Sequence, residues 1–243
     1  MEARLIGVTK KFGGTVALRD VSVEFRPGEV VALIGLNGAG KTTLLNLLAG
    51  LLVPSRGEVR FDGRAFGRDQ LDVRRRMMFI PDVPVMFGDE SLIDHLATLH
   101  RLYERPTANV EDRLVALMED FDVLGVARAP LGTLSRGQIH KSGLVGLLAI
   151  DPELWLLDEP FASGMDPHGL AAFRRHAQAA AARGRTVIYT TQILEVAQRF
   201  CDRLIVLNQG EVVRSIPGAD LRSAHAEGML DTLLESFRET PAR

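Results

Sequence analysis

Apolar and polar positions divide the chain into a strand-rich start, a helical middle, and an end in which strands and helices alternate. Val30–Ile34 is a continuous apolar run, which is typical of a strand buried on both faces. A glycine-rich loop follows, and leucines then predict a helix over Lys41–Ala49, closed by Gly50. Shorter patterns predict strands over Arg4–Val8, Val21–Phe25 and Glu58–Phe61.

The middle of the chain has a helical period. Ser91 and Asp94 have the spacing of a capping box at the start of a predicted helix over Ser91–Tyr103. Two further helices are predicted over Asn109–Phe121 and Arg136–Ala149, the second despite two internal glycines.

The last third returns to strands that alternate with helices. Leu154–Leu157 predicts a buried strand, and an alanine-rich run predicts a helix over Leu170–Ala182. Three strands and an amphipathic C-terminal helix complete the prediction, at Thr186–Tyr189, Arg203–Leu207, Glu211–Val213 and Met229–Phe237. The order predicts an α/β fold with a parallel-sheet core and two attached subdomains.

Composition narrows the class of protein. The 243 residues carry 29 basic and 31 acidic side chains. Nucleic-acid-binding proteins usually have an excess of basic residues, and this chain has none. Cys201 is the one cysteine, which excludes an intrachain disulfide and is expected to be buried. No apolar run reaches the about 18 residues that cross a bilayer, and no signal peptide is visible. We therefore expect a cytoplasmic protein that reaches a membrane only through a partner.

A phosphate-binding loop follows the first buried strand. The sequence matches G-x-x-x-x-G-K-[ST] through Gly35, Leu36, Asn37, Gly38, Ala39, Gly40, Lys41 and Thr42, and Thr43 continues it. Glycines let successive backbone N–H groups point at one anion, at the N-terminus of a helix. We expect Lys41 to reach the β- and γ-phosphates of ATP and Thr42 to bind Mg²⁺.

Two acids end the strand predicted at Leu154–Leu157. Acids at the carboxyl end of a parallel strand face the crevice where such sheets bind ligands. Asp158 is therefore expected to bind Mg²⁺, and Glu159 to polarise the attacking water.

Leu134-Ser135-Arg136-Gly137-Gln138 resembles the Leu-Ser-Gly-Gly-Gln signature of the ATP-binding cassette (ABC) family, with Arg136 in place of the first glycine. The three motifs stand in the family's order. The resemblance implies a P-loop NTPase (RecA-like) core with an N-terminal antiparallel β subdomain and an α-helical subdomain at about residues 82–145. It places one ABC ATPase domain over residues 1–220 and a helical tail over 221–243.

The resemblance assigns further residues. Phe12 looks like the aromatic residue that stacks on adenine, although a core position is the alternative. In the family two subunits pack head to tail, so Ser135, Gly137 and Gln138 would bind the ATP held by a second ABC ATPase subunit. The two subunits could form a homodimer or a heterodimer. Residues 163–166 resemble the loop that bridges two such subunits.

Two positions depart from the family pattern. Asp82 stands where most members have glutamine and resembles the exporter-like members that carry an acid at this place. It would bind Mg²⁺, and a plain turn residue is the alternative. Gln192 stands where the family has histidine; it can donate a hydrogen bond but cannot carry charge. His140 is expected at the surface, and the cluster from Arg74 to Arg76 on a solvated face.

The leading hypothesis is an ATPase subunit that powers a separate integral membrane transporter subunit, with catalytic Lys41, Glu159 and Gln192 and with Mg²⁺ held by Thr42, Asp82 and Asp158. It would lie at the inner face of the cell membrane. The alternative is a regulatory subunit that hydrolyses ATP weakly and pairs with an active partner.

Overall fold

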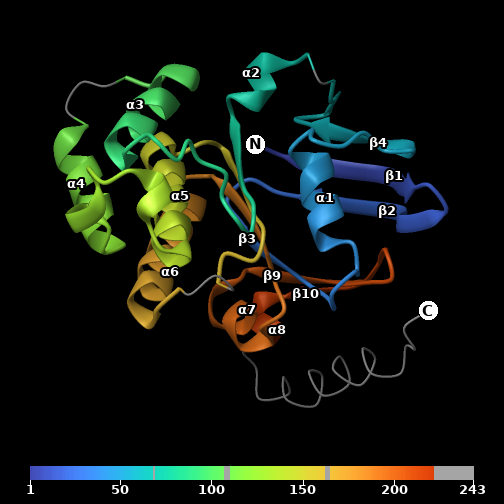
Figure 1. Ribbon diagram of the computed structural model, residues 1–243. Coiled ribbons are helices and arrows are strands. Elements are labelled where there is room, and N and C mark those ends of the chain that lie inside the picture. The colour runs from blue at the N-terminus through green and yellow to red at the C-terminus, as the bar shows by residue number, and fades with distance from the viewer. Residues whose placement is uncertain (68, 107–109, 162–164, 222–243) are drawn as a thin grey trace.

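The computed structural model describes residues 1–67, 69–106, 110–161 and 165–221, which form two sheets with helices around them (Figure 1). The six-stranded sheet has the order β10-β9-β3-β8-β7-β6. Its strands are β3 (Val30–Ile34), β6 (Met77–Ile80), β7 (Leu154–Leu157), β8 (Thr186–Thr191), β9 (Arg203–Asn208) and β10 (Glu211–Pro217). Neighbouring strands run parallel except for β10, which is antiparallel to β9.

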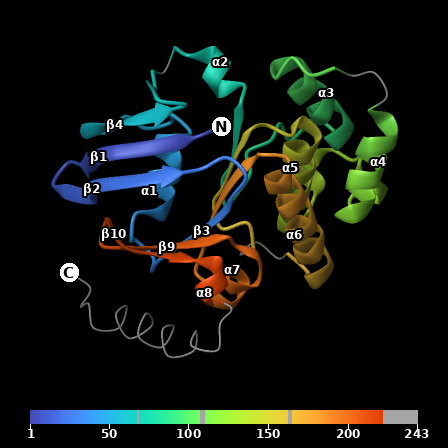
Figure 2. The same cartoon turned by 180° about the vertical axis from the view of Figure 1, so that it is seen from behind.

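The two faces of this sheet belong to different hydrophobic cores. On β3, Val31 and Leu33 face one core, and Val30, Ala32 and Ile34 face the other. The first core holds the leucines of α1 (Lys41–Leu48) and the smaller sheet. The second holds α5 (Arg136–Ile150), α6 (Pro167–Ala182) and α7 (Leu194–Phe200), which Figure 2 shows on the far side from α1. Burial on both faces explains why the strand sequences are apolar throughout.

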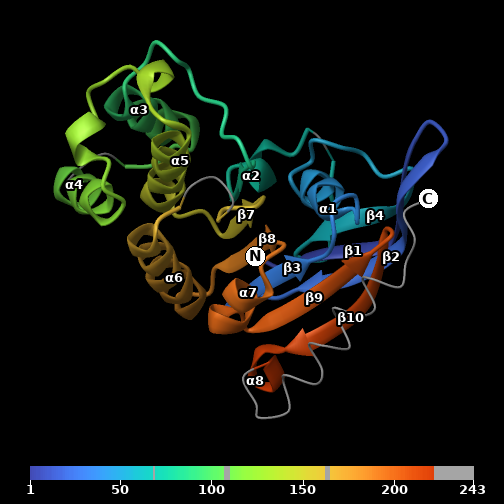
Figure 3. The ribbon, with the colours of Figure 1, turned by 60° about the horizontal axis from the view of Figure 1, so that its bottom comes forward.

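The smaller sheet is antiparallel and has the order β2-β1-β4-β5. Its strands are β1 (Ala3–Phe12), β2 (Thr15–Phe25), β4 (Arg56–Phe61) and β5 (Arg64–Ala65). Figure 3 shows α1 above the strands of both sheets, and its buried leucines belong to the core that lies between them.

The helical part of the chain lies beside the edge strand β6 (Figure 3). Its elements are α3 (Leu92–Leu102), α4 (Glu111–Asp120), two short 3₁₀ turns at Leu124–Val126 and Leu131–Thr133, and α5. Ser91 caps α3 by the predicted capping box, since its hydroxyl accepts from the Asp94 backbone N–H at 3.2 Å. One turn of helix, α2 (Leu71–Arg74), precedes β6, and another, α8 (Gly218–Leu221), follows β10.

Most predicted elements are confirmed, although three antiparallel strands are longer than expected. β1, β2 and β10 extend beyond their predicted ranges, because an antiparallel strand with one face exposed to solvent tolerates polar residues on that face. The predictions omitted β6 and α7. The predicted helix over Met229–Phe237 lies outside the described residues.

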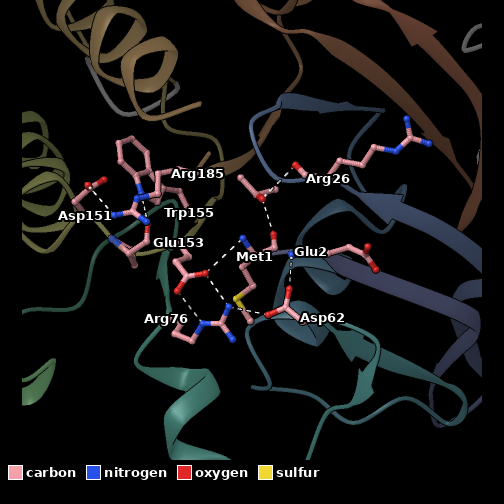
Figure 4. Close-up of polar contacts among 11 residues, drawn as sticks. Met1, Glu2, Arg26, Asp62, Arg76, Asp151, Glu153, Trp155 and Arg185 are labelled. Atoms are coloured by element: carbon pink, nitrogen blue, oxygen red, sulfur yellow. Dashed lines mark hydrogen bonds and ion pairs between the residues drawn. The ribbon is translucent and has the colours of Figure 1, made fainter. Parts of the chain in front are cut away.

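The predicted solvated face holds for Arg75, which is exposed, but only in part for Arg76, which is half-buried in a network of ion pairs. Its guanidinium bonds Glu153 at 2.7 and 2.9 Å and Asp62 at 2.7 Å, and the amino group of Met1 approaches Glu153 at 3.5 Å (Figure 4). The hydrogen bonds from Arg76 hold the pKa of Glu153 below its usual range. This network ties the start of the chain and the turn after β4 to the central sheet.

Cys201 is buried, as predicted. Among the described residues, no helix combines the length and the apolar composition that crossing a membrane requires.

Candidate functional site

The glycine-rich loop leaves β3 and enters α1 through two positions that admit no side chain. A Cβ on Gly35 would lie 2.3 Å from the carbonyl oxygen of Leu207. Gly40 precedes α1 in a left-handed conformation (φ +105°), and a Cβ there would lie 2.7 Å from the Ala17 oxygen. The loop therefore takes this path because glycine occupies both positions.

The N-terminus of α1 is open to an anion. Gly40 at the N-cap provides no side-chain hydrogen bond, so the first-turn N–H groups are not capped by it. Lys41 is buried, and its Nζ lies 2.8 Å from the Gly35 oxygen and 3.4 Å from the Leu36 oxygen. The loop thus combines backbone donors, a helix dipole and a buried cation, which is the chemistry that binds polyphosphate.

Asp158 connects this loop to the carboxyl ends of β7 and β8. Its side chain is 5% exposed. The Thr42 hydroxyl donates to Asp158 Oδ2 at 2.7 Å, and the Thr190 hydroxyl donates to Oδ1 at 2.7 Å. Sequence reasoning missed Thr190, although its place at the end of a buried strand, two residues before Gln192, was the available signal.

Glu159 lies between the loop and β8 in a left-handed conformation, with φ +46°. Such a conformation is costly for a residue with a side chain, and the surrounding contacts must hold it in place. The Glu159 N–H donates to the Thr190 hydroxyl at 2.8 Å. Glu159 Oε1 lies 3.4 Å from Lys41 Nζ and accepts from the Gln192 amide at 3.3 Å. Both neighbours hold the carboxylate at the mouth of the loop.

Lys41, Glu159 and Gln192 line one open hollow of about 440 Å³, here called the phosphate-loop pocket, whereas Gly35 and Asp158 lie behind its lining. Of the predicted residues it gathers the loop together with Phe12, Asp82, Glu159 and Gln192; its full lining is Phe12, Ala17, Leu36, Asn37, Gly38, Ala39, Gly40, Lys41, Thr42, Thr43, Asp82, Glu159 and Gln192. Phe12 is 48% exposed, which overturns the alternative that it belongs to the core. An exposed ring at the rim of such a pocket is suited to stacking on a base.

The residues of the Leu-Ser-Arg-Gly-Gln motif do not line this pocket. Ser135 caps α5, its hydroxyl accepting from the Gln138 backbone N–H at 3.3 Å while the Gln138 side chain accepts from the Ser135 N–H at 2.9 Å. The motif therefore presents a helix N-terminus outside the lining of this pocket. Of the bridging-loop prediction, residues 163 and 164 lie outside the described residues, whereas Asp166 caps α6 and pairs with Lys141.

His140 is buried at 2% exposure, so its predicted surface position is wrong. Helix α5 is buried without interruption from His140 to Ile150, which its mixed sequence did not reveal. Neither ring nitrogen has a hydrogen-bond partner among the described residues. Burial lowers the pKa of the imidazole to about 4, with Asp82 raising it and Arg136 lowering it to a lesser extent.

This histidine makes folding stability depend on pH. The unfolded chain takes up a proton below its usual pKa of about 6.5, whereas the folded chain does so only near 4, so stability falls as pH falls through this window. The wild type should lose free energy of unfolding between pH 7 and pH 5, and we expect His140→Leu to reduce that loss by about 2 kcal/mol, as measured by urea unfolding. The exposed His168→Leu variant should follow the wild type; an unchanged slope in His140→Leu would contradict the assignment.

Comparison with known proteins agrees with this geometry. A family model described as ABC transporter matches residues 18–162. The ABC-type transporter ATP-binding protein EcsA of Bacillus subtilis (strain 168) is 32% identical over 220 residues, which cover 90% of this chain and 88% of that protein.

Solved structures show the same fold. The chain is similar to an ATP-binding subunit of an ABC transporter with a TM-score of 0.89 and 29% identity, covering 98% of this chain and 100% of that one. It is also similar to a dimeric ATP-binding cassette in a post-hydrolysis state bound to ADP and phosphate, with a TM-score of 0.76, 26% identity, and coverage of 88% and 98%. The chain is an α/β P-loop NTPase and belongs to the ABC transporter family, whose ATP-binding cassettes are ATPases.

Proposed function

We propose that this cassette binds Mg-ATP in the phosphate-loop pocket and hydrolyses it to power a separate membrane-spanning subunit. One observation carries the proposal: four parts of the chain that are distant in sequence line one pocket. They are the phosphate-binding loop, Asp82, Glu159 and the amide of Gln192. The loop N–H groups and Lys41 bind the phosphates, and Phe12 stacks on adenine. Glu159 orients and deprotonates the attacking water, and Gln192 holds Glu159 in place.

The oxygen atoms beside the loop suit Mg²⁺. Thr42 and Asp158 offer a hydroxyl and a carboxylate in direct contact, and Asp82 lines the same pocket. The described residues hold no group of three or more His, Cys, Asp or Glu that could bind a metal alone. Mg²⁺ commonly uses one or two carboxylates together with phosphate oxygens and water. When bound, the ion neutralises charge on the β- and γ-phosphates.

Calorimetry with Mg-ATP tests binding directly. The wild type should take up one equivalent per chain, and Lys41→Ala should weaken uptake at least about tenfold because a buried cation is lost from the phosphates. Arg56→Ala, which removes an exposed cation outside the pocket, is the matched control. No uptake by the folded wild type would reject the proposed function.

A second cassette subunit completes the proposed active unit. Ser135, Gly137 and Gln138 lie at the N-terminus of α5, outside the pocket of their own chain. A helix N-terminus is suited to binding a phosphate. We propose that it faces the ATP held by a second subunit, as the dimeric relative supports.

An apolar groove supports a membrane partner. Two adjoining hollows, which share Arg74 and Tyr103, run between the sheet and the helical part; they are lined by Ala49, Leu51, Leu71, Arg74, Arg75, Met77, Phe79, Pro81, Val85, Leu102 and Tyr103. Val85 is 90% exposed, Leu102 64% and Leu71 62%, and Phe87 close by is 65% exposed. Exposed apolar groups that gather around a groove mark a protein interface. We propose that a helix of the membrane subunit binds here, which would hold the cassette at the cytoplasmic face.

Placing a charge in this groove should release the cassette from membranes. We expect Val85→Asp to lower the fraction of tagged chain retained on membranes of its source cells about tenfold. The control is Val213→Asp, on β10, where the valine is 47% exposed and outside the groove. Equal retention of both variants would place the partner elsewhere.

Gln192 is expected to slow turnover without abolishing it. A histidine at this position can carry charge, and a charge-assisted hydrogen bond exceeds a neutral one by about 1 kcal/mol. We therefore expect Gln192→His to raise kcat about fivefold in a steady-state phosphate-release assay. An unchanged or lower kcat, with binding intact, would show that the amide does not limit hydrolysis.

The alternative function is regulatory. Asp82 and Gln192, the two departures from the family pattern, both line the pocket. In this hypothesis the chain binds ATP, hydrolyses it weakly, and pairs with a fully active second cassette. Turnover of the wild type no higher than that of Glu159→Gln would favour it.

A further inference from the structure

We propose that Arg136 is a positioning residue that balances the negative charge of Asp82 at the mouth of the phosphate-loop pocket. The inference rests on the proposed function, because it concerns the Mg-ATP that this pocket would hold. It joins two features that sequence analysis treated separately: the acid in place of glutamine, and the arginine in place of the first signature glycine.

The two side chains are in contact across the chain. Arg136 Nη2 lies 3.5 Å from Asp82 Oδ1 and 3.4 Å from Oδ2, so one nitrogen bridges both carboxylate oxygens. Asp82 follows β6 by two residues and lines the pocket. Arg136 is the first residue of α5 and does not line it. The cation therefore acts on the pocket through the acid.

Packing between the loop and α5 keeps the pair together. Gly143, two turns into α5, faces the loop that carries Asp82: a Cβ there would lie 3.3 Å from Pro84 and 3.4 Å from Met86. The absence of a side chain at Gly143 lets the loop lie close against the helix. Asp82 and Arg136 are thereby held within reach of each other.

Each charge of the pair offsets an unfavourable electrostatic interaction of the other. A cation at a helix N-terminus is unfavourable, because it adds to the partial positive charge of that end. A carboxylate beside it is favourable, so Asp82 compensates for Arg136. In turn a carboxylate beside a triphosphate is repelled, and Arg136 compensates for that. Relative to the family pattern, Asp82 in place of glutamine adds one negative charge, and Arg136 in place of glycine adds one positive charge that balances it.

A double-mutant cycle on Mg-ATP binding tests this coupling. Calorimetry is done on full-length chains that carry Glu159→Gln, so that hydrolysis does not consume the ligand. We expect Arg136→Gly to weaken binding about two- to fivefold, since the contact is exposed. Arg136→Lys should keep most of the affinity, because it keeps the charge.

The decisive variant restores the family pair. In an Asp82→Gln background, Arg136→Gly should change affinity by less than about twofold, because no carboxylate remains to be balanced. The difference between backgrounds should shrink in 1 M salt, where the screening length falls to about 3 Å, close to the length of the contact. An equal loss in both backgrounds, or none in either, would overturn the proposal.

Urea unfolding without nucleotide gives an independent readout. The shift in the unfolding equilibrium constant caused by Arg136→Gly should differ about two- to fivefold between the Asp82 chain and the Asp82→Gln chain. An identical shift in both chains would overturn the pairing. If the wild type takes up no Mg-ATP, the proposed function fails, whereas this cycle still decides whether the two residues are coupled.

Discussion

Replacing Glu159 with glutamine should lower kcat for ATP hydrolysis by about 10²- to 10⁴-fold while leaving Mg-ATP binding within about threefold of the wild type. An amide has the size of the carboxylate but cannot take a proton from water. Its oxygen can still accept from Gln192. Lys41 keeps its contacts with the Gly35 and Leu36 oxygens, so the loop that binds phosphate is retained.

The measurement is phosphate release at saturating Mg-ATP, paired with calorimetry on the same preparations. Glu119→Gln is the matched control, because it makes the same change on the exposed face of α4. If the wild type hydrolyses ATP well above the rate in buffer and the variant stays within threefold of it, Glu159 is not the general base. If both hydrolyse ATP no faster than buffer, the regulatory function is favoured instead.

The buried strands were the most predictable part of the fold. Val30–Ile34 and Leu154–Leu157 occupy the predicted residues, because a strand covered on both faces must be apolar throughout. Helix starts were predictable where a capping pair exists, as at Ser91. The contact between Thr42 and Asp158 joins residues 116 positions apart, and only the two motifs together made it foreseeable.

Short elements and burial within helices were less predictable. β6 has four residues, among them two methionines, and follows a run of arginines, so its pattern is brief and ambiguous. The burial of His140 depends on how the helices and the loop after β6 surround α5, which local spacing does not contain. The contact between Arg136 and Asp82 also depends on this packing. In the sequence, each of the two residues is only an isolated departure from a motif.

Adding one methyl group at Gly35 should disrupt the pocket as a whole. The Cβ of Gly35→Ala would lie 2.3 Å from the Leu207 oxygen and 2.9 Å from the Ala39 Cβ. Leu207 is part of β9 in the central sheet, so the loop must move instead of the strand. Forced repacking of this kind costs about 3 kcal/mol. A displacement of about 1 Å in a positioning loop lowers kcat/KM about a hundredfold.

We therefore expect Gly35→Ala to show both a lower free energy of unfolding in urea and an about hundredfold loss in kcat/KM for ATP. Gly14→Ala is the control, because a Cβ there meets nothing within 4 Å and the residue lies outside the phosphate-loop pocket. The two measurements together distinguish Gly35→Ala from Glu159→Gln. Gly35→Ala should lower both stability and kcat/KM, whereas Glu159→Gln should lower kcat and leave the free energy of unfolding nearly unchanged. If Gly35→Ala bound Mg-ATP as tightly as the Gly14 control, the close approach of the loop to β9 would not be what shapes the phosphate site.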